Sequence, residues 1–179
     1  MLKITIPASE VWDEKTGRFS LEKECTIKLE HSLISISEWE AKWCVPFFTS
    51  EKTNDQLIDY IRCMTISKDV NPDVLLRLTS NNIKEINDYI AAPMTATTIG
   101  SDKKGRPSKE IITSEVIYYW MITYNIPVEF EKWHINRLIM LIRVCSEFNK
   151  PKKKRSRSDI IAENRALNAA RKARLGTKG

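Results

Sequence analysis

The stretch IITSEVIYYWMITYNIPVEFEKWHINRLIMLIRVCSEF, residues 111–148, decides the fold class because it holds the two strongest helical patterns of the chain. Residues 111–125 are apolar almost all round their middle, which indicates a buried helix. After Pro127, a second helix is predicted over 129–148, with apolar residues on two sides. Such a helix packs against two surfaces, so we expect it at the centre of the fold. Its longer stripe consists of Phe130, Trp133, Leu138, Leu141, Val144, Cys145 and Phe148, and its second stripe of Ile135, Ile139 and Ile142.

Helix-start signals precede most of the other apolar stripes. A capping box, in which a Ser or Thr is followed three residues later by Glu or Gln, satisfies free N–H groups at a helix start. The pattern occurs at Ser35/Glu38, Ser37/Glu40 and Thr53/Gln56, and Asn71–Pro72 is a good N-cap and first-residue pair. The stripes that follow are Ile36, Trp39 and Trp43; Leu57, Ile61 and Met64; and Ile83, Ile86 and Ile90.

The N-terminal part alternates instead of following a helical period. Apolar residues recur at every second position over 2–6 and again over 25–29, which is typical of half-buried strands. Gly17 lies between the two runs, so a hairpin with a long loop is expected, and Trp12 falls in that loop. The predicted fold class is therefore mainly α (α+β): a helical domain with a small N-terminal β-hairpin.

Residues 94–110 interrupt the helical rhythm. Thr95, Thr97 and Thr98 favour an extended backbone, and Gly100, Gly105 and Pro107 mark an exposed loop. We expect this segment to be the most mobile part of the domain.

Charge divides the chain into two parts. The whole chain has a formal net charge of +6, but residues 150–179 contain 11 Lys and Arg against 2 Asp and Glu. The remaining residues then hold 18 basic and 21 acidic side chains. A basic terminal block on a mildly acidic body is typical of an interaction arm. We predict a globular domain over 1–149 and a basic arm over 150–179 that is partly disordered until it binds.

The arm, PKKKRSRSDIIAENRALNAARKARLGTKG over 151–179, supports three interpretations. Its first seven residues resemble a nuclear import signal. Nucleic-acid binding through Lys152, Lys153, Lys154, Arg155 and Arg157 follows from charge, but without an aromatic residue it would be sequence-blind. As a handle for a protein partner, Ser156 caps a last helix and Gly176 ends it. The helix would bind through Ile160, Asn164, Leu167, Asn168, Arg171 and Leu175, and Ile160, Leu167 and Ala170 would share the face that is buried on binding.

Catalytic and metal chemistry are not expected. No nucleophile elbow, zinc-protease motif or Gly-rich phosphate loop occurs. His31 and His134 are predicted to be packed or partly exposed side chains, the four Cys to be reduced core residues, and Asp13/Glu14 and Glu38/Glu40 to be solvated carboxylates. Trp39, Trp43, Trp120 and Trp133 are predicted to point inward. The sequence thus predicts a protein without cofactor, metal or enzymatic activity.

Membrane insertion is not expected either. MLKITIPASE lacks the apolar run of a signal peptide. The longest apolar run, residues 116–122, is far shorter than the roughly 20 residues that span a bilayer. We therefore expect a soluble cytosolic protein.

The order of segments resembles the tail assembly chaperones of tailed phages of the siphovirus type. The likeness covers almost the whole chain: MLKITIP (1–7), SEWEAKW (37–43), DYIRCMT (59–65), MTATT (94–98), 110–145 and ALNAARKARLGTKG (166–179). It implies a non-enzymatic protein of the infected bacterium's cytoplasm that binds the tape-measure protein, keeps that long helical chain in solution and is absent from the mature virion. It is also compatible with a homo-oligomer. Two alternatives stay open: a basic-armed nucleic-acid-binding phage protein, and a minor structural protein of the tail or connector.

Overall fold

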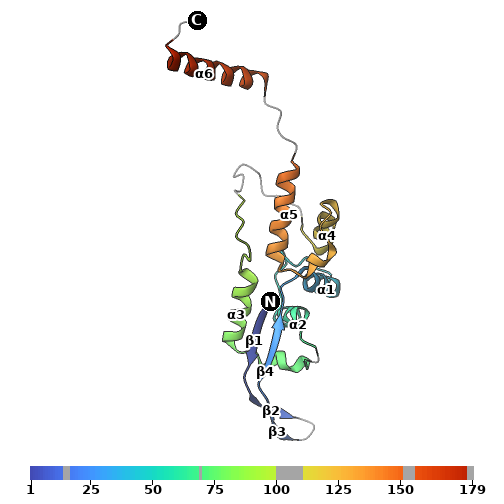
Figure 1. Cartoon of the computed structure of the whole chain (residues 1–179). Helices are drawn as coiled ribbons and strands as arrows, with labels where there is room; N and C mark the ends of the chain where they lie inside the picture. Colours follow the sequence, from blue (N-terminus) through green and yellow to red (C-terminus); the bar gives the residue numbers. More distant parts are fainter. Residues whose placement is uncertain (14–16, 69, 100–110, 151–155, 177–179) are drawn as a thin grey trace. The chain divides into compact units, whose positions relative to one another are not determined.

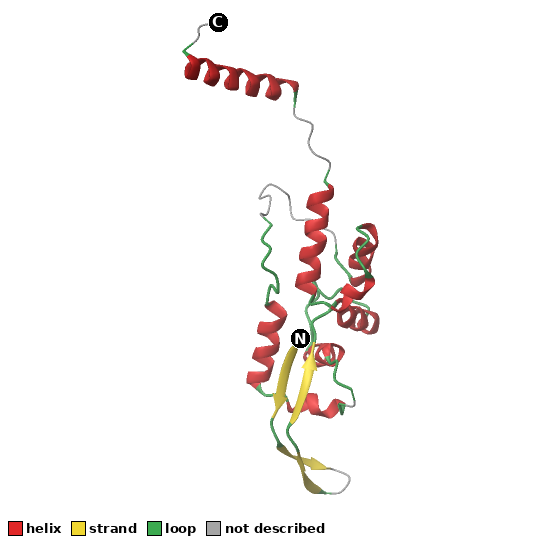
Figure 2. Cartoon of the chain, viewed as in Figure 1, coloured by secondary structure: helices red, strands yellow, loops and turns green. Residues whose placement is uncertain are grey.

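The computed structural model describes residues 1–13, 17–68, 70–99, 111–150 and 156–176, without the side chains of 11–13 and 20 (Figure 1). Within these ranges it contains six α-helices, two short 3-10 helices and four five-residue strands (Figure 2). The predicted mainly α fold with a small N-terminal hairpin is therefore confirmed. The chain divides into two compact units, the body (Met1–Phe148) and a C-terminal unit (Asn149–Gly179).

The N-terminal hairpin consists of two ladders that keep the same register and are separated by unpaired residues. β1 (Leu2–Ile6) pairs antiparallel with β4 (Cys25–Leu29), and β2 (Ser9–Asp13) pairs antiparallel with β3 (Arg18–Glu22). The two numbers of every residue pair add to 31 in both ladders, as for Leu2 with Leu29 and Ser9 with Glu22. The predicted long loop is therefore itself a ribbon, with Gly17 at φ 63° before β3. Trp12 lies on β2 and not in a loop.

The β1–β4 ladder covers one side of the core. Ile4, Ile6, Ile27 and Leu29 are fully buried, while the residues between them are exposed. This alternation follows from the opposite directions of successive side chains on a strand. In the body, α3 lies beside β1, whereas α2 and the first 3-10 helix lie on the side of β4 (Figure 1).

The interruption of the hairpin is held by one arginine. η1 (Pro72–Arg77) is a 3-10 helix whose N-cap, as predicted, is Asn71 followed by Pro72. Its last residue, Arg77, is 11% exposed and donates from Nη2 to the C=O groups of Pro7, at 2.6 Å, and Lys23, at 3.1 Å. These carbonyls lie between the two ladders, so the guanidinium supplies donors where strand pairing stops.

Helix α1 (Leu33–Trp43) begins earlier than the sequence predicts. Ser32 is the N-cap, and its hydroxyl and that of Ser35 form a reciprocal capping box. The boxes predicted at Ser35/Glu38 and Ser37/Glu40 are therefore wrong. β4 ends three residues before Ser32, which is the first capping residue after the strand and has the extended backbone that an N-cap needs. Ile36 and Trp39 are buried as predicted, and Trp43 is half-buried.

The next two helices follow their sequence signals more closely. α2 (Asn54–Met64) has the predicted Thr53/Gln56 capping box, and Ile61 and Met64 are buried while Leu57 is exposed. α3 (Ser80–Ala91) is capped by Thr79, with Ile86 buried, Ile90 half-buried and Ile83 at the surface.

The helix predicted over 129–148 is broken. It consists of η2 (Val128–Lys132), a 3-10 helix, and α5 (Ile135–Asn149), separated by Trp133 and His134. Trp133 has extended backbone angles, and the N–H of Ile135 donates to His31 C=O at 2.7 Å. These tertiary contacts replace helical bonds at the break. The buried residues of α5 are Ile135, Leu138 and Ile142, taken from both predicted stripes.

Two side chains of the predicted central helix therefore leave the core. Trp133 is half-buried, stacked on Phe130 at 4.0 Å between ring centroids, and Phe148 is 87% exposed. Helix α4 (Ser114–Thr123) is also less buried than its composition predicts. Ile117 and Met121 are in the core, but Tyr119 and Ile122 are exposed on its outer side.

The loop and cysteine predictions have mixed outcomes. Residues 92–99 form neither helix nor strand and contain one bend, and residues 100–110 lie outside the described residues. Glu14 also lies outside them. No disulfide links the four Cys, which all lie in described ranges. Cys25, Cys63 and Cys145 are half-buried, but Cys44 is exposed as the left-handed C-cap of α1 and is not a core residue.

The C-terminal unit contains α6 (Arg157–Leu175). Ser156 is its N-cap and accepts from Asp159 N–H at 3.1 Å, while Gly176 ends it at φ 64°. Both signals were predicted from the sequence. Among the described helices, none combines the length and apolarity that crossing a membrane requires.

Candidate partner-binding surfaces

The six residues predicted to contact a protein partner lie along one side of α6. Ile160, Asn164, Leu167, Arg171 and Leu175 are spaced three or four residues apart, and Asn168 flanks them. Leu167 is 50% exposed, and every described side chain of α6 is classed as exposed. The helix therefore presents apolar, amide and guanidinium groups on the same side. It is held by its local caps and by the basic residues of its last turn, which complement the helix dipole.

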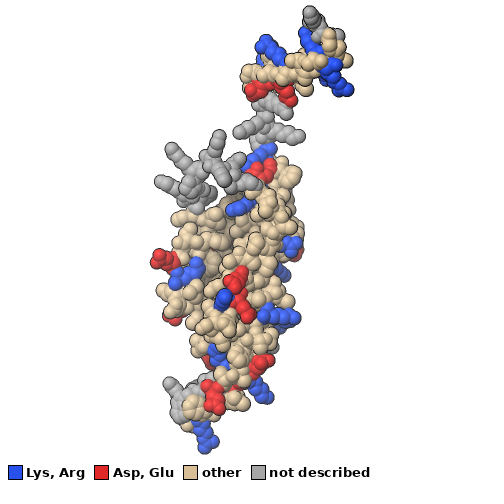
Figure 3. Space-filling view, turned by 90° about the vertical axis from the view of Figure 1, so that its left-hand side faces the viewer, with Lys and Arg blue, Asp and Glu red and all other residues tan. Residues whose placement is uncertain are grey.

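The alternative nucleic-acid residues are only partly described. Arg157 is the first residue of α6 and is exposed. Lys152, Lys153, Lys154 and Arg155 lie outside the described residues. On the face of the body in Figure 3, basic and acidic side chains are interspersed among larger uncharged areas. That face offers no single-sign field for a polyanion.

A second apolar surface lies on the body. A groove of about 440 Å³ separates α4 from α5 beside the turn that follows α1. Trp120 and Tyr124 form its α4 wall, and Ile139 and Ile142 its α5 wall. Arg143 and Ser146 are the polar groups that line it, together with apolar Phe48 and Ile112. An apolar hollow with few polar groups is typical of a site for an apolar ligand or side chain.

The apolar run on α4 is the sequence signal for this groove, although its pattern predicts a buried helix. Residues 116–122 are apolar with little periodicity, and such a segment is usually enclosed on all sides. In the structure, one side of α4 packs against α1 and the other carries Tyr119 and Ile122, which is 76% exposed. An apolar helix that remains partly exposed is also what an interaction surface requires.

A buried carboxylate on α1 binds backbone N–H groups close in sequence to two groove residues, Phe48 and Ile112. Glu40 on α1 is 7% exposed; its Oε1 accepts the N–H of Phe47 and its Oε2 that of Ser114, both at 2.7 Å. The prediction that Glu40 is solvated is therefore wrong, while Glu38 is exposed as predicted. Lys52 packs over the Phe47 ring at 4.2 Å, and burial lowers the pKa of its amine although Glu40 opposes the shift.

A charged cluster joins α1 and α2 at another place. Asp59 accepts from Lys42 at 2.6 Å, Trp43 at 2.8 Å and Arg62 at 2.9 Å. Burial alone would raise the pKa of this carboxyl, but the three hydrogen bonds outweigh burial and lower it. The three donors to Asp59 are side chains of α1 and α2, so the cluster joins the two helices.

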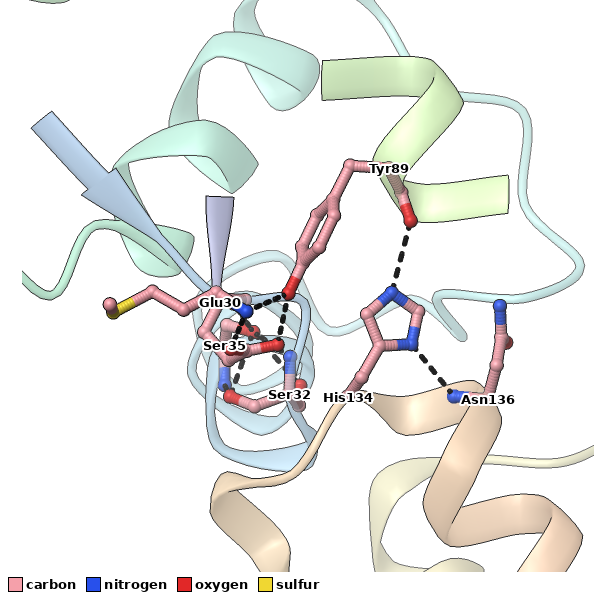
Figure 4. Close-up of polar contacts among 7 residues, drawn as sticks. Glu30, Ser32, Ser35, Tyr89, His134 and Asn136 are labelled. Atoms are coloured by element: carbon pink, nitrogen blue, oxygen red, sulfur yellow. Dashed lines mark hydrogen bonds and ion pairs between the residues drawn. The ribbon is translucent and has the colours of Figure 1, made fainter. Parts of the chain in front are cut away.

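The two histidines, far apart in sequence, lie against each other in the core. Their ring centroids are 5.1 Å apart in an edge-on arrangement. His134 Nδ1 accepts the N–H of Asn136 at 3.3 Å, so Nε2 carries the proton and donates to Tyr89 C=O at 3.0 Å (Figure 4). His31 Nδ1 shares a hydrogen bond with the Tyr60 hydroxyl. Both rings are buried, as predicted, and both nitrogens of His134 are engaged by backbone groups.

Polar groups around the pair form a partly buried network. The Tyr89 hydroxyl donates to Glu30 at 2.6 Å, and the amino group of Met1 pairs with Glu30 at 2.7 Å (Figure 4). Burial, with the charge of His134 as a second cause, lowers the pKa of His31 to about 3, and burial lowers that of His134. Both imidazoles are therefore neutral at pH 7, which suits packing side chains. In the described ranges, no group of three or more His, Cys, Asp or Glu is arranged to hold a metal.

Comparison with protein-family models, with curated proteins and with solved structures finds no match to this chain.

Proposed function

We propose that the chain is a non-enzymatic tail assembly chaperone of a tailed phage, which binds the tape-measure protein in the cytoplasm of the host bacterium and is absent from the mature virion. The observation that carries this proposal is the side of α6 that holds Ile160, Leu167 and Leu175 beside two Asn, all of them exposed. A chaperone of long apolar helices needs such a surface, because helices in grooves or bundles recognise one another through apolar residues at three- and four-residue spacing.

The groove between α4 and α5 supplies a second contact in this proposal. Trp120 and Tyr124 present large rigid rings, which are enriched in the energetically dominant positions of protein interfaces. The tape-measure helix would insert apolar side chains between these rings and Ile139. Two separate weak contacts on one partner raise the overall affinity without either being tight.

A sequence-blind nucleic-acid arm is the alternative with a specific observation in its favour. α6 carries Arg157, Arg165, Arg171, Lys172 and Arg174 against Asp159 and Glu163. The two functions differ in what α6 contributes. Charge alone serves a phosphate backbone, whereas a protein partner also uses Leu167 and Leu175.

The proposal is tested by co-expressing the full chain with the tape-measure protein encoded by the same phage and capturing the complex. A Leu167→Ser, Leu175→Ser variant is compared with a variant in which Lys152, Lys153, Lys154 and Arg155 are changed to Glu. We expect the Leu variant to lose binding by about 1.5–3 kcal/mol per buried Leu and the charge variant to retain most of it. If capture survives the Leu changes and is abolished by the charge reversal, the hypothesis that α6 binds its partner through apolar residues is wrong. If the wild type captures no tape-measure protein, the proposed function is wrong.

A further inference from the structure

On the outer edge of β4, the backbone groups of Lys28 are hydrogen-bonded to a neighbouring segment, whereas those of Thr26 are open. In an antiparallel ladder, alternate residues direct their N–H and C=O groups toward the paired strand and away from it. Lys28 directs both groups away from β1: its N–H donates to Ser67 Oγ at 2.8 Å, and its C=O accepts the N–H of Ile66 at 2.9 Å. Thr26, two residues earlier on the strand, must direct its backbone groups to the same side.

The segment that bonds to Lys28, at Ile66 and Ser67, forms no hydrogen bond with the backbone of Thr26. The chain after Ser67 leaves the strand edge, and a cavity of about 900 Å³ opens between Thr26 and Val70, Asn71 and Val74. Among the described residues, none is hydrogen-bonded to the outward N–H and C=O of Thr26. The opposite edge of the ribbon differs, because Asn82 of α3 donates to the C=O of Thr5, the residue paired with Thr26.

The open edge is lined by excess positive charge. Lys23, Lys28 and Lys68 line the cavity, are exposed, and form no ion pair with any described residue. Arg77 and Glu22 face each other at 3.8 Å, so among the described residues of the lining Glu24 is the remaining acidic one. Exposed Leu21 and Ile66 add apolar surface at its rim.

We propose that this edge binds an extended acidic segment of a partner protein, which adds a strand beside β4. Backbone pairing with Thr26 would supply affinity, and carboxylates at alternate positions would face Lys23, Lys28 and Lys68. Strand addition to an exposed edge is a general mode of peptide recognition in which alternate side chains set specificity. The charge of the lining selects an acidic segment over a basic one. This site shares no residue with α6 or with the α4–α5 groove, and it does not depend on the proposed function.

The test uses the outward direction of the Thr26 N–H. Thr26→Pro removes that donor without removing a bond of the β1–β4 ladder, and proline is tolerated on edge strands for this reason. Thr26→Val is the matched control, because it loses the side-chain contact with Thr5 but keeps the N–H. Each full-length protein is titrated with a capped peptide of alternating Asp and Val, and with its Lys–Val counterpart, while amide signals and exchange of Thr26 are followed by NMR.

We expect the Asp–Val peptide to shift and protect the amide at position 26 in the wild type and in Thr26→Val. Thr26→Pro should bind about tenfold more weakly, the equivalent of one hydrogen bond of about 1.4 kcal/mol, and the Lys–Val peptide should bind none of the three. No protection of Thr26 at millimolar peptide, or equal binding by the Pro and Val variants, would overturn the proposal. If Thr26→Pro does not fold, a Lys23→Glu, Lys28→Glu, Lys68→Glu variant decides: it must lose the Asp–Val peptide, and retained binding contradicts the site.

Discussion

The carboxylate of Glu40, near the end of α1, accepts the backbone N–H of Ser114, the first residue of α4, at 2.7 Å. Thr113, the N-cap of α4, forms no side-chain capping bond with the described residues. Glu40 therefore caps α4 from another helix, 74 positions away along the chain. An anion at a helix N-terminus is favoured both by the free N–H groups and by the helix dipole.

Glu40→Ala should destabilise the body by about 3 kcal/mol, because two buried N–H groups, those of Phe47 and Ser114, lose a charged acceptor. Glu40→Gln should cost less, since the amide oxygen still accepts one of them. Urea unfolding followed by fluorescence measures both. Glu38→Ala is the control on the same helix: Glu38 is exposed, and its loss should change stability by less than about 0.5 kcal/mol. Equal effects of the Ala changes at 38 and 40 would contradict the capping role.

The difference between Glu38 and Glu40 illustrates what the sequence could predict. Local signals identified the strand alternation, the Thr53, Asn71 and Ser156 caps and the helical content, because each depends on neighbours within a few residues. The role of Glu40 depends on Ser114, and no local pattern connects the two positions. The break at Trp133 has the same origin, since His31 C=O accepts the N–H of Ile135 in place of a helical acceptor and Tyr89 C=O accepts the His134 side chain.

The candidate surfaces also differ in whether local sequence patterns can predict them. The α6 face follows from helical spacing alone, so its residues were identified from the sequence. The groove needs α4 and α5 to be side by side with Trp120 and Ile139 across from each other, which is tertiary information. The open edge at Thr26 depends on where the chain leaves β4 after Ser67, and the alternation of apolar residues does not contain that information.

Trp39 and Trp133 should respond differently to truncation. Trp39 is fully buried and donates from its indole to Gln56 C=O at 2.9 Å, so Trp39→Ala should cost about 3–5 kcal/mol. Trp133 is half-buried between Phe130 and Arg137, whose guanidinium lies 3.9 Å from the ring centroid, so Trp133→Ala should cost about 1–2 kcal/mol. Chemical denaturation measures both. A cost at Trp133 that equals or exceeds that at Trp39 would restore the prediction of a central core tryptophan.

The buried histidine pair should make the body sensitive to mild acid. In the folded state the pKa of His31 is lowered from 6.5 to about 3 and that of His134 is also lowered, so the unfolded chain binds these protons first. The contribution of His31 is fully present above pH 6.5 and is lost as the pH falls toward 3, by up to about 1.4 kcal/mol per pH unit, and His134 adds a loss in the same direction. The pKa of Asp59 is lowered from an ordinary 3.8, so its contribution is lost only at lower pH.

His31→Phe separates this effect from that of the carboxylates. The ring keeps the packing against Phe47 and Tyr60 but does not titrate, so the loss of stability between pH 6.5 and 4.5 should be shallower than in the wild type. Urea midpoints at several pH values measure the slope. A wild-type stability that stays constant over this range would show that the pair is not held neutral.

Removal of residues 150–179 should leave the thermal unfolding of the body nearly unchanged. No described side chain of α6 is buried, and the residues that make up the core lie before Phe148. Calorimetry of the full chain and of a chain ending at Asn149 compares the two midpoints. A loss of several degrees on truncation would mean that α6 stabilises the body and is not a separate arm.

Arg77→Met should loosen the β2–β3 ribbon more than the β1–β4 ladder. A two-stranded ribbon is marginal by itself, and Arg77 holds its base through the C=O groups of Pro7 and Lys23. The change removes both charge-assisted bonds, but it also removes the buried Nε, which has no acceptor among the described residues. The net local cost should therefore be about 1–2 kcal/mol.

Amide hydrogen exchange should accelerate by about tenfold over Ser9–Asp13 and Arg18–Glu22, with little change at the amide of Ile27. Arg62→Met, which removes an exposed partner of Asp59, is the control and should leave the ribbon unaffected. Equal acceleration in both ladders would show that Arg77 stabilises the whole body instead of the interruption of the hairpin.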